Sequence, residues 1–348
     1  MTIVENKQLE ILAPRGLYGR ADTPWRLSVA PMIDVTDRHC RFFHRLLAPK
    51  ALLYTEMITT GALIHGDIAK HLKFNDEEHP LALQLGGSDP QDLAHCARLG
   101  QEWGYDEINL NCGCPSERVQ KGAFGACLMA EPQLVADCIK AMQDTVDLPV
   151  TVKHRLGLDY GTSYDFVRDF VGQIYDTGCR VFVTHARNAV LKGLSPKDNR
   201  EIPPLRYDVV TQLKRDFPEA LFVLNGGLKE VQQMHTMANE FDGVMIGRAA
   251  WHDPYLLREA SQLLWPDVTV PSNETVVDIM TTYAAEELAA GVPMRLTVRA
   301  MLGLVNGQKG SRLWRRTLSD HRLLAGNDPA FLMQAFVQFQ NSQLLYEQ

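Results

Sequence analysis

The stretch that decides the fold is LFVLNGGLKEVQQMHTMANEFDGVMIGR, residues 221–248. The apolar run 221–225 ends at Gly226-Gly227, and a second apolar run, 243–246, ends at Gly247 after a segment long enough for a helix. Strand, helix and strand in this order form a parallel pair. Glycine loops after such strands let backbone N–H groups approach an anion, although ordinary tight turns also use glycine. The stretch predicts two parallel strands ending at a phosphate site.

The same pattern recurs along the first 250 residues of the chain. Short apolar runs rich in β-forming residues alternate with segments that read as helices, at Leu27–Ala30, Leu52–Tyr54, Leu81–Leu85, Glu107–Asn111, Val150–Lys153, Val181–His185, Leu221–Asn225 and Gly243–Ile246. Eight such units predict a TIM (β/α)8 barrel. A doubly wound open sheet is the alternative, but polar residues follow the strands around the whole set and not at one switch point.

The composition is that of an ordinary globular protein. The chain has 348 residues, 35 Lys and Arg against 42 Asp and Glu, and 45% hydrophobic residues, which excludes disordered and collagen-like classes. Its 7 cysteines are odd in number, which fits reduced thiols in the cytoplasm better than a disulfide framework. No stretch approaches the roughly 18 apolar residues of a membrane span. We expect a cytoplasmic protein without a membrane anchor.

Three parts are expected along the chain. Residues 1–24 lack a compact apolar run and predict an N-terminal extension, residues 25–254 the barrel, and residues 255–348 a smaller all-helical domain. Within 295–322, seven Lys or Arg side chains face one acidic residue, Asp320, a net charge of +6. This island on an acidic protein predicts an anionic partner, with a solvated helix face as the alternative.

Polar residues at the ends of the strands suggest the ligand. Lys153 and His185 close apolar strands, where an unpaired cation is costly, so each is expected to meet an anion or a polar ligand. Gln84 lies among leucines of an inward strand and offers amide donors and acceptors to a planar ring. Together with the glycine loops, these residues suggest flavin mononucleotide (FMN).

Cys114 lies in a Gly-Cys-Pro turn directly after a strand. A free thiol has a pKa of about 8.5 and is mostly protonated at neutral pH, so it can act as an acid. The alternatives are a buried structural cysteine and half of a metal site with Cys112. No second Cys or His pair completes such a site, so no metal is expected.

The chain resembles the tRNA-dihydrouridine synthases, and within them the A-type branch, which acts in the D-loop of tRNA. The resemblance extends from about Leu27 to Leu318 and is carried by APM (30–32), YTEM (54–57), QLGGS (84–88), NLN (109–111), CPS (114–116), GACL (125–128), HAR (185–187), REIPPL (200–205), NGG (225–227) and RLWRR (312–316). It implies tRNA uridines 20 and 20a as substrate and NADPH as reductant. No G-x-G-x-x-G fingerprint is present, so NADPH is expected to visit transiently.

The resemblance also implies roles for individual residues. Cys114 would be the catalytic acid and Asn111 would hold the uracil, while tRNA would meet Lys197 and Arg200 near the barrel and Arg312, Arg315 and Arg316 in the helical domain. FMN would be held by Pro31, Met32, Gln84, Lys153, His185, Asn225, Gly226, Gly227, Gly247 and Arg248.

One position departs from the family: Cys112 stands where relatives carry an apolar residue, and its thiol could compete for oxidation. A flavin-dependent reductase of small ene or pyrimidine substrates is the runner-up function, but it would not need a basic helical tail. A non-catalytic binder of structured RNA is the third. No obligate protein partner is expected.

Overall fold

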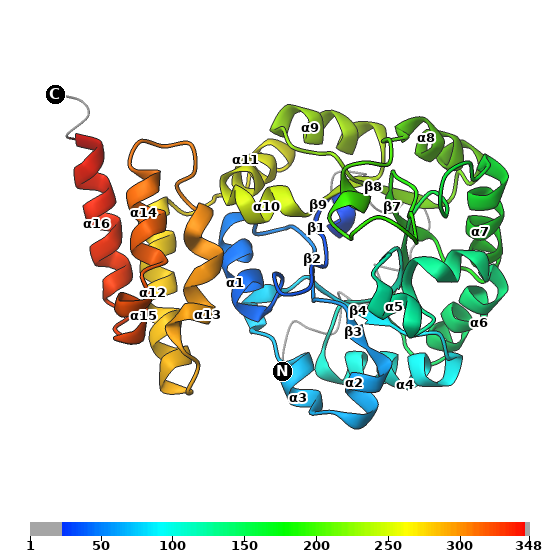
Figure 1. Ribbon diagram of the computed structural model, residues 1–348, viewed down its shortest axis with the longest axis horizontal. Coiled ribbons are helices and arrows are strands. Elements are labelled where there is room, and N and C mark those ends of the chain that lie inside the picture. Colours follow the sequence, from blue (N-terminus) through cyan, green and yellow to red (C-terminus); the bar gives the residue numbers. More distant parts are fainter. Residues whose placement is uncertain (1–22, 345–348) are drawn as a thin grey trace.

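A computed structural model describes residues 23–344, so residues 1–22 of the expected extension lie outside the described part of the chain. Its centre is a ring of parallel strands: β1 (Leu27–Val29), β2 (Leu53–Tyr54), β4 (Leu81–Gly86), β5 (Glu107–Cys112), β6 (Val150–His154), β7 (Val181–His185), β8 (Leu221–Asn225) and β9 (Gly243–Ile246). Neighbours pair in the order β1-β9-β8-β7-β6-β5-β4-β2 (Figure 1). The backbone N–H of Val29 donates to the carbonyl of Leu52 over 3.0 Å, which links β1 back to β2. The predicted barrel is confirmed.

The sequence did not predict one strand, β3 (Ile58–Thr59), which pairs with the end of β4 through Ile58 and Leu85. Two residues are too few to show the alternation of a strand, so a sequence pattern cannot reveal it. The strand follows the loop after β2 and adds a short extension beside the ring.

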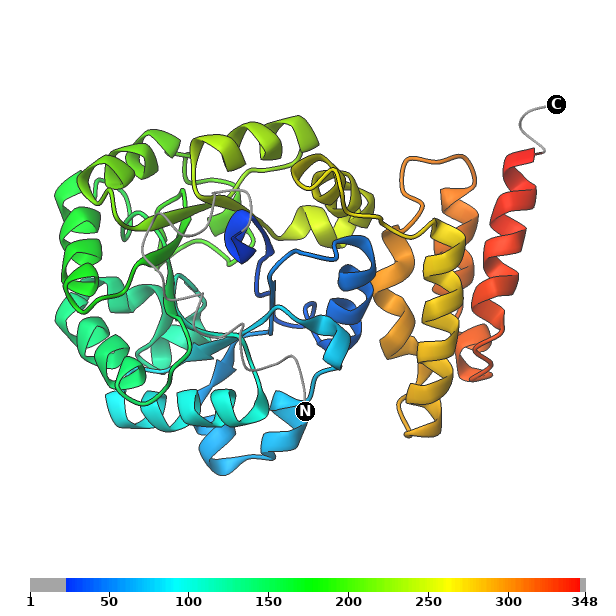
Figure 2. The same cartoon turned by 180° about the vertical axis from the view of Figure 1, so that it is seen from behind.

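Helices surround the ring on its outer side, as the two opposite views show (Figures 1 and 2). They are α1 (Arg38–Leu47), α2 (Thr60–His65), α3 (Ile68–Leu72), α4 (Pro90–Trp103), α5 (Glu117–Lys121), α6 (Pro132–Gln143), α7 (Tyr164–Asp176), α8 (Tyr207–Asp216), α9 (Val231–Glu240), α10 (Arg248–His252) and α11 (Pro254–Leu264). In α4 the Asp89 side chain caps the first turn, Pro90 begins the helix, and Gly104 ends it with a φ of 94°.

The rest of the chain is a helical region beside α1 (Figure 1): α12 (Asn273–Ala289), α13 (Met294–Val298), α14 (Ser311–Leu318), α15 (His321–Ala325) and α16 (Phe331–Leu344). α11 instead packs on the barrel, and its Leu257 belongs to the barrel core. The division of the chain after residue 254 stays a prediction. Among residues 23–344, every helix is too short or too polar to cross a bilayer.

The helical region shares its core with the barrel. Phe42, Phe43 and Leu47 of α1 join one apolar cluster with Met280, Trp314, Leu332 and Phe336 of the helical region. The ring of Phe42 stacks on Tyr283 of α12 at 4.1 Å between centroids. Arg38 of α1 forms an ion pair with Glu287 of α12. The first barrel helix is therefore part of the interior of the helical region.

Candidate active site

The turn that carries Cys114 is held by Asn111, the residue before the last of β5. Asn111 Oδ1 accepts hydrogen bonds from the backbone N–H groups of Gly113 at 3.1 Å and Cys114 at 3.0 Å. The carbonyl of Cys114 accepts from the N–H of Ala126 at 2.9 Å, and the Cys114 thiol lies 3.5 Å from Ser116 Oγ. These bonds hold both the N–H and the carbonyl of Cys114, while its thiol remains partly exposed.

Lys153 is the residue before the last of β6 and is the register partner of Asn111 on β5. Its Nζ donates to Asn225 Oδ1 at 3.2 Å, and Asn225 Nδ2 donates to the carbonyl of Met245 at 2.8 Å. Burial, together with the positive charge of Arg155, lowers the pKa of Lys153 to about 7. No carboxylate among the described residues forms an ion pair with this ammonium. Two of its three N–H groups therefore remain for an electron-rich ligand.

His185 and the glycine loop after β8 pack against each other. A Cβ on Gly226 would lie 2.6 Å from Cδ2 of His185, and one on Gly227 would lie 2.4 Å from Leu205. Both glycines have positive φ, at 111° and 74°. Any larger residue would be strained here, both by the positive φ and by the contact of its Cβ with His185 or Leu205. The loop therefore brings its backbone close to the buried imidazole. Burial, the nearby arginines and Lys153 lower the pKa of His185 well below its usual value, which favours the neutral imidazole.

Several cations converge on the same ends of the strands. Although burial lowers the pKa of Lys153, Arg155 and Arg200, a negative charge on Cys114 would act in the opposite direction on all three. Arg248, after β9, pairs with Glu201 in the loop after β7 and donates to the carbonyl of Arg200 at 3.3 Å. The site therefore has an excess of positive charge, which suits a phosphate and the transient charge of a thiolate.

The loop after β1 lies against Gly247 at the end of β9. A Cβ on Gly247, after β9, would lie 3.5 Å from the Met32 sulfur and 3.4 Å from Cβ of Ala30. The Met32 backbone N–H donates to Thr36 Oγ1 at 3.0 Å, which folds this loop back on itself. Met32 is therefore placed beside Gly247, and Pro31 precedes it, partly exposed.

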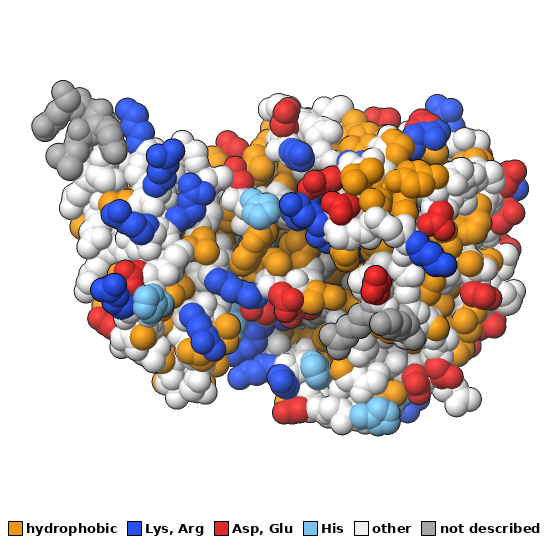
Figure 3. Space-filling model, viewed as in Figure 1, with side chains coloured by type: hydrophobic (Ala, Val, Ile, Leu, Met, Phe, Trp, Pro, Cys, Tyr) orange, Lys and Arg blue, Asp and Glu red, His pale blue; other side chains and the backbone are white. Residues whose placement is uncertain are grey.

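Some of the predicted residues lie elsewhere. Lys197 is exposed at the start of the short 3-10 turn Asp198–Arg200 in the loop after β7. Arg312, Arg315 and Arg316 are exposed on α14, in the helical region. Lys and Arg side chains gather over this region on the face shown in Figure 3, with few acidic side chains among them. The three α14 arginines form a separate basic surface, away from the strand ends that carry Lys153 and His185.

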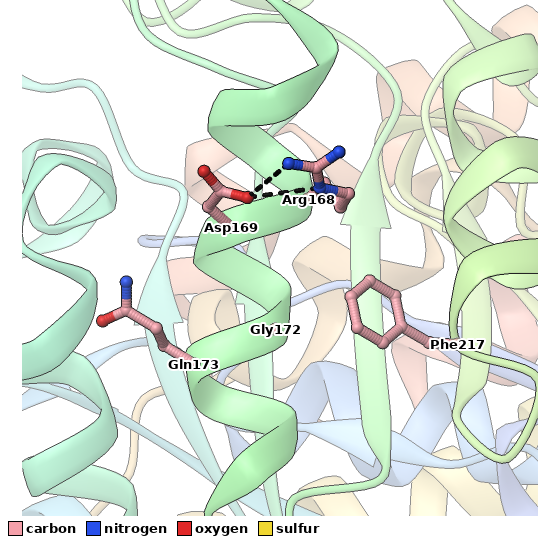
Figure 4. Close-up of a pocket in the computed structure, with 5 residues that line it drawn as sticks. All are labelled: Arg168, Asp169, Gly172, Gln173 and Phe217. Carbon is pink, nitrogen blue, oxygen red and sulfur yellow. Dashed lines mark hydrogen bonds and ion pairs between the residues drawn. The ribbon is translucent and has the colours of Figure 1, made fainter.

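Two hollows in the described part of the chain differ in position. A cavity of about 340 Å³ lies on the outer side of α7, where Arg168 already pairs with Asp169 (Figure 4); its lining is Arg168, Asp169, Gly172, Gln173 and Phe217. A second cavity of about 260 Å³ is lined by Leu156, Tyr160 and Asn188 of the loops after β6 and β7, among others. The first is remote from the strand ends, so it plays no part in the site.

The cysteine beside Cys114 is different in kind. Cys112 is fully buried, and burial raises the pKa of its thiol well above the usual value. In the part of the chain that the structure describes, no three His, Cys, Asp or Glu side chains gather as metal ligands.

Two groups of residues in the site were not predicted. Arg155 donates from Nε to the carbonyl of Gly113 at 3.1 Å and from Nη1 to the carbonyls of Asn188 and Asn199. It ties the Cys114 turn to the loop after β7; its place directly after Lys153 and His154 was the available signal. The second group is Asn109 and Thr151 inside the barrel, where Asn109 accepts a hydrogen bond from the predicted Gln84 and donates one to Thr151.

The chain has clear relatives. The family model "Dihydrouridine synthase (Dus)" matches residues 28–341. A tRNA-dihydrouridine(20/20a) synthase of Pseudomonas putida is 56% identical over 86% of this chain and 90% of its own, and one of Synechocystis is 53% identical over 89% and 93%. A 2-naphthoyl-CoA reductase structure aligns with a TM-score of 0.52 at 12% identity, over 68% of this chain and 50% of that one, which supports the fold alone. The chain belongs to the dihydrouridine synthase family.

Proposed function

We propose that this protein reduces the C5=C6 bond of uridine in tRNA to 5,6-dihydrouridine, with FMN as cofactor and NADPH as the reductant that visits it. The observation that carries the proposal is the Asn111–Cys114 turn, which sets a thiol beside Lys153 at the ends of β5 and β6. Membership of the Dus family supports the reaction class.

The residues at the strand ends fit FMN. Lys153 has free N–H groups, and Gln84 keeps one amide N–H beyond the one it donates to Asn109. The positive-φ glycines Gly226 and Gly227 bring backbone close to His185. We propose that these residues hold FMN together with Pro31, Met32, Asn225, Gly247 and Arg248. FMN, when bound and reduced, supplies the hydride that C6 of the uracil receives.

The chain itself supplies the proton. C5 takes a proton from the Cys114 thiol as the C5=C6 π bond breaks, which leaves a thiolate. Lys153, Arg155 and Arg200 lie within electrostatic reach of that charge and stabilise it. The amide of Asn111 orients the uracil, since its Oδ1 is occupied by the turn and its Nδ2 remains a donor toward a carbonyl oxygen. A stacked base cannot reach this site, so the uridine must be extruded from the RNA.

The tRNA is proposed to meet two surfaces. Lys197 and Arg200 lie in the loop after β7, near the barrel mouth, by which we mean the carboxyl ends of the ring strands and the loops that follow them. The exposed Arg312, Arg315 and Arg316 lie on α14. Phosphates contacted at both surfaces would position the D-loop, with uridines 20 and 20a as targets. On this proposal residues 25–254 carry the chemistry, residues 255–348 grip RNA, and the protein works in the cytoplasm.

Two measurements test this function. The purified full-length protein is expected to show flavin absorption, and with NADPH it is expected to form dihydrouridine at positions 20 and 20a of tRNA from cells that lack the enzyme. Mass spectrometry or sequencing of the treated tRNA locates the product. A folded protein that binds no FMN would overturn the oxidoreductase. Free uridine reduced as fast as tRNA would favour a small-molecule reductase, and product at other positions would change only the target.

A further inference from the structure

A buried carboxylate lies inside the barrel at the amino end of β5, opposite the end that carries the Cys114 turn. Glu107, the first residue of β5, is 2% exposed and receives three hydrogen bonds. Trp25 Nε1 donates to Oε2 at 2.6 Å, while Tyr54 OH at 2.8 Å and Thr151 Oγ1 at 2.5 Å donate to Oε1. Burial raises the pKa of Glu107 to about 7, and the three donors oppose that shift. None of the proposed catalytic steps uses this group.

A continuous series of hydrogen bonds joins this carboxylate to the Cys114 turn. Asn109 Nδ2 donates to Thr151 Oγ1 at 2.8 Å, and Gln84 Nε2 donates to Asn109 Oδ1 at 2.7 Å. Asn111 Nδ2 donates to Gln84 Oε1 at 2.8 Å, and Asn111 Oδ1 accepts from the turn. Gln84, Asn109 and Thr151 are register partners on β4, β5 and β6, so they lie in one layer. Glu107, Asn109 and Asn111 alternate along β5 and therefore share a face.

The two ends of this series dictate the direction of every bond in it. Backbone N–H groups only donate, so Asn111 must turn Oδ1 toward the turn and Nδ2 toward Gln84. Gln84 must then accept with Oε1 and donate with Nε2, and Asn109 must do the same. The Thr151 oxygen accepts from Asn109, so its O–H must point to an acceptor. Oε1 of Glu107 is that acceptor.

We propose that Glu107, Thr151 and Asn109 are positioning residues that fix the orientation of the Gln84 and Asn111 amides from the floor of the barrel. This inference rests on the proposed function, because Gln84 and Asn111 are the amides assigned to FMN and uracil. With the orientation fixed, the only group that Asn111 can offer a substrate is an N–H donor, which matches a pyrimidine carbonyl oxygen. An exocyclic amino group in that position, as on cytosine, would face donor to donor and be rejected.

The chain offers a matched pair of variants. Thr151→Val removes the hydroxyl that links Asn109 to Glu107 while keeping the shape of the side chain. Tyr54→Phe removes an O–H donor from the same oxygen of Glu107 but lies outside the series. Both variants deprive the buried carboxylate of one hydrogen bond, and only the first interrupts the series. Thr151→Ser retains the link and serves as the rescue.

The first measurement is hydrogen–deuterium exchange of the Gly113 and Cys114 amides in the full-length protein without added nucleotide. We expect faster exchange in Thr151→Val by about tenfold and exchange at the wild-type rate in Tyr54→Phe and Thr151→Ser, since about 1.4 kcal/mol corresponds to a factor of ten. The second is kcat/KM for dihydrouridine formation, expected to fall about 10- to 100-fold in Thr151→Val alone, mainly through kcat.

The outcomes separate the two proposals. Equal effects of Thr151→Val and Tyr54→Phe on both measurements, or wild-type behaviour of Thr151→Val, would overturn the positioning series. Wild-type protein that forms no dihydrouridine would overturn the proposed function, while the exchange rates would still report whether the series orders the turn.

Discussion

The barrel mouth and the basic surface of α14 use positive charge in opposite ways. At the barrel mouth, Arg155 is 3% exposed and donates hydrogen bonds to backbone carbonyls of two loops. On α14, Trp314 is fully buried against the helical core, while Arg312 and Arg316 project from the helix into solvent. Buried, bonded cations fix geometry, whereas exposed ones act over a Debye length of about 8 Å in physiological salt and are screened as salt rises. On the proposed function, this difference separates the residues that set the chemistry from those that supply RNA affinity.

The largest effect should come from the mouth. Cys114→Ala removes the proposed proton donor and is expected to lower dihydrouridine formation by about 10²–10⁴-fold, the range of general acid catalysis. FMN binding and NADPH oxidation should stay nearly intact. Single-turnover assays with tRNA, beside flavin reduction followed by absorbance, measure the two separately.

Cys112→Ala is the matched control, since its thiol is buried two residues away. We expect little change in either rate. Equal losses in the two variants, or full activity of Cys114→Ala, would remove Cys114 from its assigned role.

The basic surface should show the reverse pattern. Charge reversal at Arg312, Arg315 and Arg316 to Glu is expected to weaken tRNA binding about 10- to 100-fold and to lower the salt slope by about one unit per lost phosphate contact. Slow NADPH oxidation should be unchanged. Binding titrations of tRNA at several salt concentrations measure both effects.

Three exposed cations on the outer barrel helices give a control of equal charge: Arg98→Glu, Lys140→Glu and Arg215→Glu together. This variant should keep the wild-type salt slope, because no tRNA contact is proposed there. If both triple variants bind tRNA alike, net charge and not the α14 surface governs affinity.

A smaller effect should appear as a pH dependence of the mouth alone. Burial lowers the pKa of Lys153 to about 7, below its ordinary 10.5, so between these values the unfolded chain binds more protons than the folded one. The stability of the FMN-free protein should therefore rise with pH across that window. On the proposed function FMN is bound by the charged ammonium, so its affinity is expected to fall up to about tenfold per pH unit above pH 7.

Fluorescence titration of FMN between about pH 7 and pH 9 measures this affinity. Lys153→Met should bind weakly with a flat profile. A wild-type profile that is equally flat would show that Lys153 does not bind FMN as a cation, and tRNA binding to α14 should not follow the same curve.

The sequence predicted the barrel and the polar residues that lie at its strand ends, because both leave local signals. The apolar runs that form β5 to β9 are long enough, and their polar end residues distinct enough, to be recognised in the sequence. In Asn225-Gly226-Gly227 the two glycines themselves indicate a turn with positive φ. Membership of the expected family is confirmed. The roles assigned to individual residues remain predictions.

What the sequence did not show depends on contacts between distant segments. Glu107 looks like an ordinary strand residue until Trp25, Tyr54 and Thr151 are seen to meet it from three other segments. Arg155 gains its meaning from Gly113 and Asn199, which lie over forty positions away. Such pairings depend on barrel closure and register, which no local pattern encodes.

The core shared by α1 and the helical region fixes the distance between two parts of the molecule. Phe42 stacks on Tyr283 and Arg38 pairs with Glu287, so the distance from the α14 surface to the Cys114 turn is set by packing and not by a flexible linker. An RNA gripped at one end of a fixed span can present only the nucleotide that lies that far away. We therefore expect a D-loop lengthened or shortened by one nucleotide to shift which uridine is modified, rather than simply to weaken binding.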